Sequence, residues 1–232
     1  MGPDGTVYVA DAGRKAVIAL PPDGAPRALA EGQLAEPSAV AVLPDGNLMV
    51  VDAGAGAIYR LSADGQLGEK LVPELPMYSP RGIGAAADGR LVVADTGNNR
   101  LLLLAPDGSA QTVGDLKEPT DAAFLPDGSL LVAETGADQL TIVKPDGQRV
   151  TSWPMPHANT VVGPHVAVLP AGGWVATAPE IRSVLRMPPG GRAPEIWAAE
   201  PDWRKPVGVA AGPSGVVVTD IESATAVLLS LP

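Results

Sequence analysis

The feature that most constrains this chain is a short motif that recurs about every 40 residues along its length. In its strong form the motif is an acidic residue, a variable residue and a glycine, and an apolar run precedes it. Four copies are strong and the last two are weak: DAGRKA (11–16), DAGAGA (52–57), DTGNNR (95–100), ETGADQ (134–139), APEIRS (178–183) and DIESAT (220–225). A fixed period of this size is typical of a propeller or a solenoid.

Each repeat is predicted to be a four-stranded antiparallel meander. In residues 80–113 the D-G pairs at Asp88 and Asp107 are hairpin signals, because glycine adopts a positive φ without a Cβ clash. Short apolar runs lie between these turns, at 81–87, 91–94 and 101–105. They are too short for helices and are bounded by turn residues, so they read as strands.

A closed ring is favoured over an open solenoid by the contrast between strands. The first strands are dominated by Ala, Val and Gly, as expected where several sheets converge on a narrow axis: 38–43, 81–87, 120–125, 165–169 and 207–211. The second and third strands are more continuously apolar, as sheets stacked face to face require.

The DTGNNR stretch is interpreted as a structural corner, because catalysis would not need the same group in nearly every repeat. Asp95 ends a strand, where its carboxylate can accept backbone N–H groups in an Asx-type turn. Gly97 and the two asparagines that follow it are expected to supply left-handed conformations.

The stretch VADTGNNRLLLLAPDG (93–108) resembles the signature of NHL repeats, and residues 9–24 and 132–147 support the resemblance. It covers almost the whole chain, strongly in the first four repeats and weakly in the last two. Glu180 and Glu222 replace the corner glycine there, so those corners are expected to be built differently. The resemblance implies an all-β, six-bladed β-propeller of four-stranded antiparallel blades.

The repeats predict one propeller domain over residues 1–232, divided into units at 1–36, 37–79, 80–118, 119–163, 164–205 and 206–232. The innermost strand of the first unit and the outermost strand of the last are missing, so those blades are expected to be incomplete. Because Met1 to Gly5 reads as the middle of a repeat, the chain is expected to be a fragment of a longer protein. A signal, an anchor or a partner domain could precede it.

Composition narrows the classes of function. There is no cysteine, so neither disulfides nor thiolate chemistry operates. No apolar run is long enough for a transmembrane helix, so no membrane insertion is expected. The net charge of -10 would repel a phosphate backbone, which disfavours nucleic acid, although the same acidity also serves solubility. The expected partner is a protein, a peptide or a glycan, and the oligomeric state stays open.

Candidate site residues lie in the loops that lead into the innermost strands, here called the lead-in segments: 33–38, 73–81, 115–120, 153–165 and 201–207. In a chain with 3% aromatic residues, these loops gather aromatic and arginine side chains, the composition of a recognition hot spot. The predicted ligand-binding rim consists of Tyr78, Arg81, Thr120, Asp121, His157, His165, Trp203 and Arg204. The alternative is that these groups only hydrate the mouth of the ring.

Two classes of function stay open beside a purely structural spacer. The first is a non-enzymatic binding, sensory or scaffold propeller without a cofactor. The resemblance implies this class, because NHL propellers serve as extracellular sensor domains and assembly scaffolds, which favours an extracytoplasmic location.

The second is a lactonase- or lyase-like enzyme, since related propellers hold Ca²⁺ or Zn²⁺ that polarises a substrate oxygen. Its metal ligands would be His165, Asp121, Glu118 and Glu134. Only two histidines exist for a zinc site, whereas a calcium site of oxygen ligands stays open.

Overall fold

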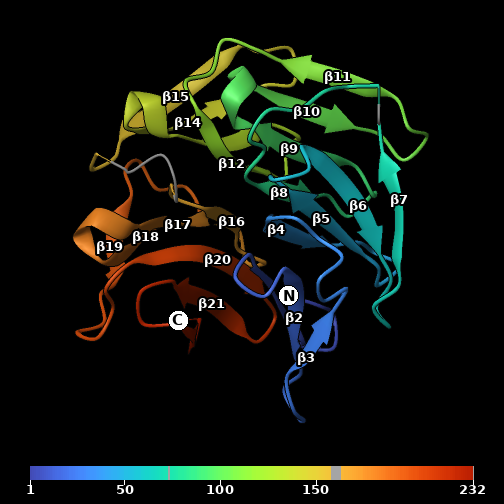
Figure 1. Cartoon of the computed structure of the whole chain (residues 1–232). Helices are drawn as coiled ribbons and strands as arrows, with labels where there is room; N and C mark the ends of the chain where they lie inside the picture. The colour runs from blue at the N-terminus through green and yellow to red at the C-terminus, as the bar shows by residue number, and fades with distance from the viewer. Residues whose placement is uncertain (73, 158–162, 232) are drawn as a thin grey trace. The chain divides into compact units, whose positions relative to one another are not determined.

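A computed structural model describes residues 1–72, 74–157 and 163–231. Those residues form six antiparallel sheets (Figure 1). Two compact units, Met1–Gly114 and Asp115–Pro232, each contain three of the sheets.

The first unit contains the sheets β1–β3, β4–β7 and β8–β11, each with its strands in sequence order. Their bounds are β1 Val7–Asp11, β2 Ala16–Leu20, β3 Arg27–Leu29, β4 Pro37–Val42, β5 Leu48–Asp52, β6 Ala57–Leu61, β7 Leu67–Leu71, β8 Ile83–Ala85, β9 Leu91–Asp95, β10 Arg100–Leu104 and β11 Ala110–Val113. A 3-10 turn, η1 Thr96–Asn98, joins β9 to β10.

The second unit contains the sheets β12–β15, β16–β19 and β20–β22. Their bounds are β12 Pro119–Phe124, β13 Leu130–Glu134, β14 Gln139–Val143, β15 Arg149–Pro154, β16 Val166–Val168, β17 Trp174–Ala178, β18 Ser183–Met187, β19 Glu195–Ala198, β20 Pro206–Gly212, β21 Gly215–Asp220 and β22 Thr225–Leu229. The 3-10 turns η2 Thr135–Ala137 and η4 Pro179–Ile181 occupy two of the corners. No helix among the described residues is long and apolar enough to cross a membrane.

The predicted fold class, an all-β six-bladed propeller, is confirmed. Every described sheet is an antiparallel meander, four of them have four strands, and the first and last have three. The expectation of incomplete first and last blades is therefore also confirmed. The D-G hairpins form as predicted: Gly89 has a φ of 85°, and Asp88 accepts the backbone N–H of Arg90.

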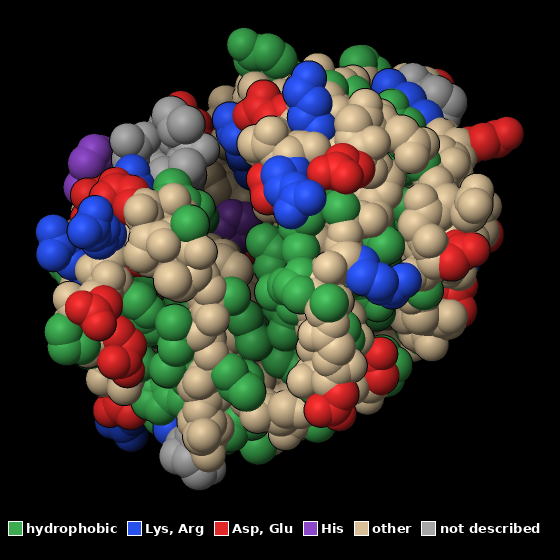
Figure 2. All heavy atoms as spheres, turned by 60° about the horizontal axis from the view of Figure 1, so that its bottom comes forward, with side chains coloured by type: hydrophobic (Ala, Val, Ile, Leu, Met, Phe, Trp, Pro, Cys, Tyr) green, Lys and Arg blue, Asp and Glu red, His purple; other side chains and the backbone are tan. Residues whose placement is uncertain are grey.

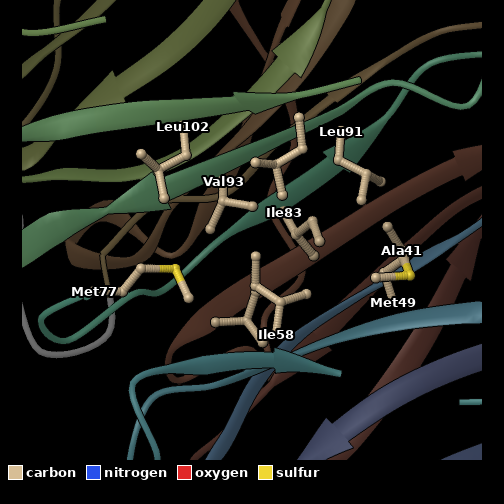
Figure 3. Packing of buried hydrophobic residues seen from close by; sticks show 10 residues of the cluster. Ala41, Met49, Ile58, Met77, Ile83, Leu91, Val93 and Leu102 are labelled. Atoms are coloured by element: carbon tan, nitrogen blue, oxygen red, sulfur yellow. The ribbon is translucent and has the colours of Figure 1, made fainter. Parts of the chain in front are cut away.

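Neighbouring blades pack through the apolar faces of their central strands. Between the sheets β4–β7 and β8–β11, Met49 and Ile58 meet Leu91, Val93 and Leu102 (Figure 3). All five side chains are buried, which is the face-to-face packing that the continuous apolar runs predicted. This packing holds the corners and lead-in segments on rigid strands.

The corner geometry corrects one prediction. Gly97 is not left-handed; Asn99 is, with a φ of 55° and a ψ of 40°. The same corner position is left-handed in every repeat, and it is occupied in turn by Lys15, Gly56, Asn99, Asp138, Arg182 and Ala224. The backbone path of the corner thus determines which residue is left-handed. The fifth and sixth corners follow the same path although they lack the corner glycine. Gly97 is needed for another reason, which involves Tyr78.

Candidate functional site

The repeated corner acids hold the lead-in segments by hydrogen bonds. Asp52 accepts the backbone N–H groups of Ala35 and Glu36 at 2.7 and 2.8 Å. Asp95 accepts the N–H of Tyr78 at 2.8 Å and the Nε of Arg100 at 2.7 Å. The structural role predicted for the corner acids is confirmed. Their backbone N–H partners, however, lie in the lead-in segment about one strand pair earlier in the chain. The Asx-type turn predicted at Asp95 is therefore not what forms. Pairing of buried carboxylates with N–H donors leaves these groups unavailable for chemistry.

Glu134 is a metal ligand in the enzyme alternative, but its carboxylate is also occupied by hydrogen bonds within the fold. Its buried carboxylate accepts hydrogen bonds from both terminal guanidinium nitrogens of Arg149, at 2.6 and 2.9 Å, and from the N–H of Lys117 at 3.0 Å. Burial by itself would raise the pKa of Glu134, but the hydrogen bonds from Arg149 and Lys117 hold it below its usual value. Glu134 is therefore a structural carboxylate.

Tyr78 is the most exposed large hydrophobic side chain among the described residues, at 67%. Its backbone is fixed on both sides, because its N–H donates to Asp95 and its carbonyl accepts the N–H of Gly97 at 2.9 Å. A Cβ added to Gly97 would lie 2.2 Å from Cδ1 of the Tyr78 ring. The absent side chain of Gly97 thus lets the aromatic ring lie on the corner.

Arg81 lies on the same lead-in segment as Tyr78, in the first unit. Its side chain is 27% exposed and approaches Glu36 at 3.7 Å, while its carbonyl accepts the hydroxyl of Ser38 at 2.9 Å. Pro73, at the start of this segment, is outside the described residues. The structure therefore places Tyr78 and Arg81 on one loop, with Tyr78 much the more accessible.

Thr120 connects two blades of the second unit. It is buried, and its hydroxyl donates to the carbonyl of Pro164 at 3.0 Å, just as Ser38 bonds across to the next lead-in segment in the first unit. Ser38 and Thr120 both follow the proline of their lead-in segment, and at both positions the hydroxyl is bonded to the next blade.

Asp121 and His165 are two predicted site residues whose side chains meet. His165 Nδ1 lies 3.2 Å from Asp121 Oδ2, and the two side chains are 18% and 8% exposed. The same carboxylate oxygen accepts the backbone N–H of Val166 at 3.0 Å, which fixes its position. Asp121 stands two positions after the proline of its lead-in segment, where the other repeats have the uncharged residues Ala39, Gly82, Val166 and Gly208. The pair is therefore an irregular feature of one blade junction.

The four side chains proposed for a metal do not fit such a site. Only His165 and Asp121 come together, Glu134 is held by Arg149, and Glu118 is exposed on its lead-in segment. Within residues 1–72, 74–157 and 163–231, no three His, Cys, Asp or Glu side chains form a group that could hold an ion. No step of a reaction is therefore derived through Ca²⁺ or Zn²⁺.

His157 contacts a different acid from the one that His165 contacts. Its side chain is 86% exposed and its Nδ1 lies 3.0 Å from Asp138. The hydrogen bond to the Asp138 carboxylate, together with its negative charge, raises the pKa of His157 above the usual value. Residues 158–162 of this predicted segment are outside the part of the chain that the structure describes.

Trp203 and Arg204 line a polar hollow of about 500 Å³ in the second unit. Trp203 is 2% exposed, and its indole N–H has no hydrogen-bond partner among the described residues. The hollow also contains Arg182 and Glu222, from the fifth and sixth corners, which the sequence analysis did not select. The signal that could have found them is their departure from the corner pattern, since Glu222 replaces the corner glycine.

Charge on the molecular surface is mixed in sign. On the face that Figure 2 presents, Lys and Arg side chains lie among Asp and Glu side chains, with hydrophobic side chains exposed between them. Several of the charges pair, such as Arg14 with Glu31 and Arg90 with Asp88. Exposed pairs of this kind contribute little to stability.

Comparison with known proteins identifies the repeat and the fold. The NHL repeat family profile matches residues 77–102, which contain the Tyr78 loop and the DTGNNR corner. No curated protein sequence matches the chain.

Solved structures share the fold at low sequence identity. A chain in the crystal structure of a nidogen–laminin complex has a TM-score of 0.80 and 16% identity, over 97% of this chain and 89% of its own. A catalytically inactive histidine-to-alanine variant of virginiamycin B lyase from Staphylococcus aureus, crystallised with quinupristin, has a TM-score of 0.73 and 16% identity, over 100% and 78%. A candidate gluconolactonase has a TM-score of 0.73 and 19% identity, over 96% and 83%. The repeat match at residues 77–102 and the six antiparallel sheets support an NHL-repeat β-propeller, and the solved structures share its fold.

Proposed function

We propose that this propeller is a non-enzymatic recognition module that binds a protein or peptide partner through its lead-in and corner loops. The observation that carries the proposal is Tyr78, an exposed aromatic residue whose backbone is fixed by Asp95 and Gly97. A residue whose backbone is already fixed loses less conformational entropy on binding, and aromatic anchors dominate interface energetics.

The surroundings of Tyr78 support this role. Arg81 follows on the same loop, while the repeated carboxylates beneath the loops are used for hydrogen bonds within the fold.

In the second unit, Arg182 and Arg204 line the hollow beside Trp203 and offer guanidinium groups to a carboxylate of a partner. The net charge of -10 opposes a nucleic-acid partner. The likeness in fold to a chain of a nidogen–laminin complex is consistent with protein recognition.

Substitution of Tyr78 by alanine tests the proposal. We expect partner affinity to fall about tenfold or more, because a hot-spot aromatic contributes about 2 kcal/mol or more. The melting temperature should change little, since the ring is mostly exposed. Partners recovered from the source cells by affinity purification would be identified, purified and titrated against both proteins. Tyr59→Ala, on β6, is a matched aromatic control, and equal affinity of the wild-type and Tyr78→Ala proteins would exclude this loop.

A second candidate function, lyase or lactone-hydrolysing activity, is favoured by the His165 and Asp121 pair. A carboxylate at Nδ1 orients an imidazole and fixes its tautomer, which leaves Nε2 of His165 available as a general base. The likeness to virginiamycin B lyase and to a candidate gluconolactonase makes cyclic esters the substrates to examine.

Turnover of quinupristin and gluconolactone by the purified protein tests this second candidate. If His165 is the base, His165→Ala should abolish turnover, and Asp121→Asn should reduce it by a factor of about 10² or more. His157→Ala, which removes the exposed histidine, should leave the rate unchanged. Absence of turnover in the wild-type protein, or turnover that survives His165→Ala, would count against an enzyme at this pair.

A further inference from the structure

A groove of about 730 Å³ lies between the sheets β4–β7 and β8–β11 of the first unit. It extends from the D-G hairpins of the two blades to Leu71, Val72 and Glu74, where the chain leaves β7. Neither Tyr78 nor Arg81 lines it, so it is separate from the surface proposed above for partner recognition.

The floor of the groove is apolar. Met49, Leu91 and Leu104 are buried in the packed interface between the blades, and Leu71 is half-buried beside them. Figure 3 shows Met49 and Leu91 in the cluster that separates the two sheets. Such a floor favours the burial of a further large aliphatic side chain.

The register of the sheets shows what fills the equivalent junction of the second unit. Leu71 pairs with Ile58, just as Trp153 pairs with Leu140 in the fourth blade, so Leu71 and Trp153 are equivalent. Leu91 and Trp174 each begin the second strand of the following blade. In the second unit the two tryptophan rings pack together, with centroids 5.4 Å apart. Leu71 and Leu91, which both line the groove, are smaller than the tryptophans at these positions.

The rim of the groove is acidic. It carries Asp45, Asp88, Asp107 and Glu74 against a single cation, Arg60, which pairs with Asp45. Among the described residues, no ion pair joins Asp107 or Glu74 to a cation, and both are exposed.

Hydrogen bonds within the hairpins favour the ionised form of two of the rim acids. The backbone N–H of Ser109 lowers the pKa of Asp107, and that of Arg90 lowers the pKa of Asp88. An apolar floor with negative charge at its edge is complementary to an apolar group that carries a cation.

We propose that this groove binds an extended peptide segment of a partner protein in which a large aliphatic side chain stands next to a lysine or arginine. The aliphatic side chain occupies the space that Trp153 and Trp174 fill at the equivalent junction. The cation lies at the rim near Asp107 and Glu74. The groove is thus a second recognition surface, defined by two leucines in place of two tryptophans.

A fluorescein-labelled peptide of alternating leucine and lysine is the probe, and its binding is measured by anisotropy at about 0.15 M salt. Peptides of alternating serine and lysine, and of alternating leucine and glutamate, separate the apolar from the charged contribution. We expect the leucine–lysine peptide to bind at least about tenfold more tightly than either. Equal binding of the serine–lysine peptide would show unspecific attraction to an acidic protein and overturn the proposal.

Groove-filling variants test the site without changing any charge. Leu71→Trp and Leu91→Trp each copy the side chain of the closed junction and should weaken peptide binding about tenfold. Leu71 is only half-buried, so Leu71→Trp is the variant expected to fold normally if Leu91→Trp does not. Unchanged binding by a folded Leu71→Trp protein would place the peptide elsewhere.

A matched pair of hairpin variants tests the rim. Asp107→Asn removes a charge at the groove, and Asp146→Asn removes the equivalent hairpin charge of the next blade, which does not line the groove. We expect the first to weaken binding several-fold and the second to leave it unchanged, as should Tyr78→Ala. Equal effects of the two hairpin variants would contradict the proposal. So would a concentration-dependent dimer, seen in sedimentation and lost in Leu71→Trp, because it would assign the groove to a second copy of the chain.

Discussion

Replacing Asp220 with alanine is expected to lower the free energy of unfolding by about 3 kcal/mol or more. The buried Asp220 carboxylate accepts four backbone N–H groups: those of Arg204 and Lys205 at 2.7 Å, of Glu222 at 3.0 Å and of Ser223 at 2.9 Å. Without the carboxylate these donors lose their acceptor, and each buried unpaired donor costs about 1–3 kcal/mol. Urea unfolding of the two proteins at pH 7 measures the difference.

The first corner provides a matched control for Asp220. Asp11 occupies the equivalent position but accepts only the N–H of Arg14, at an exposed site, so Asp11→Ala should cost no more than about 1 kcal/mol. Asp220→Asn keeps one acceptor oxygen and should fall between the two. If Asp11→Ala and Asp220→Ala were equally destabilising, hydrogen bonding to the lead-in segment would not be the cause.

The Asp220 effect is also expected to depend on pH. Burial alone would raise the pKa of Asp220, but the hydrogen bonds from Ser223, Lys205 and Arg204 lower it below the usual value. A lowered folded pKa means that the stabilisation is fully present above the unfolded pKa of about 3.9, and is lost as the pH falls through the folded value. The gap in stability between the wild-type and Asp220→Asn proteins should therefore narrow below about pH 4. A gap that stays constant to pH 2 would contradict this linkage.

Replacing Gly97 with alanine is expected to cost about 1–3 kcal/mol and also to move Tyr78. The added Cβ would lie 2.2 Å from Cδ1 of the Tyr78 ring and 2.7 Å from the Tyr78 carbonyl oxygen, so both the ring and the backbone must shift. If Tyr78 is the anchor proposed above, Gly97→Ala should weaken partner binding as Tyr78→Ala does. Thermal unfolding and the partner titration measure the two effects.

Gly136 supplies the control, because it holds the same corner position one repeat later. A Cβ there would lie 3.2 Å from the side-chain atoms of Glu118, which is exposed. Gly136→Ala should therefore change stability by less than about 1 kcal/mol. Both glycines occupy 3-10 turns outside the left-handed region, so a difference between the variants reports the neighbour and not the backbone conformation. Equal destabilisation would mean that contact with Tyr78 is not the reason for Gly97.

The fold could be predicted from the periodic residues because these residues act through local backbone chemistry. A D-G pair closes a hairpin in the same way wherever it occurs, and Gly46, Gly89 and Gly128 have φ values of 83°, 85° and 83°. The recurrence of acids at the corners likewise indicated a structural role instead of a catalytic one. Each of these acids accepts a backbone hydrogen bond from the lead-in segment before it: Asp52, Asp95, Glu134 and Asp220. What the period did not show was the partner of each acid, because that partner belongs to the preceding loop.

Residues of the candidate site could be selected from the sequence, but their surroundings could not be predicted. The irregular loop residues that were selected include Tyr78, His165 and Asp121, but the sequence could not tell that Thr120 and Trp203 are buried or that Glu134 is held by Arg149. Burial and pairing depend on which side chains of neighbouring blades meet. Arg182 and Glu222 were not selected, because they line a hollow with Trp203 only where two corners meet the lead-in segment 201–207.

The sequence by itself determined the repeat, the four-stranded meander, the six-bladed class and the corners, because turn residues and apolar periodicity act over a few neighbouring positions. Only the tertiary structure decided which polar side chains stay exposed and where a groove opens between blades. Leucines at positions 71 and 91 look unremarkable as strand residues, and only the structure shows that they line a groove and that Trp153 and Trp174 stand at the equivalent positions. Such space is set by the volumes of side chains that are distant in sequence, since cores pack to a nearly constant density.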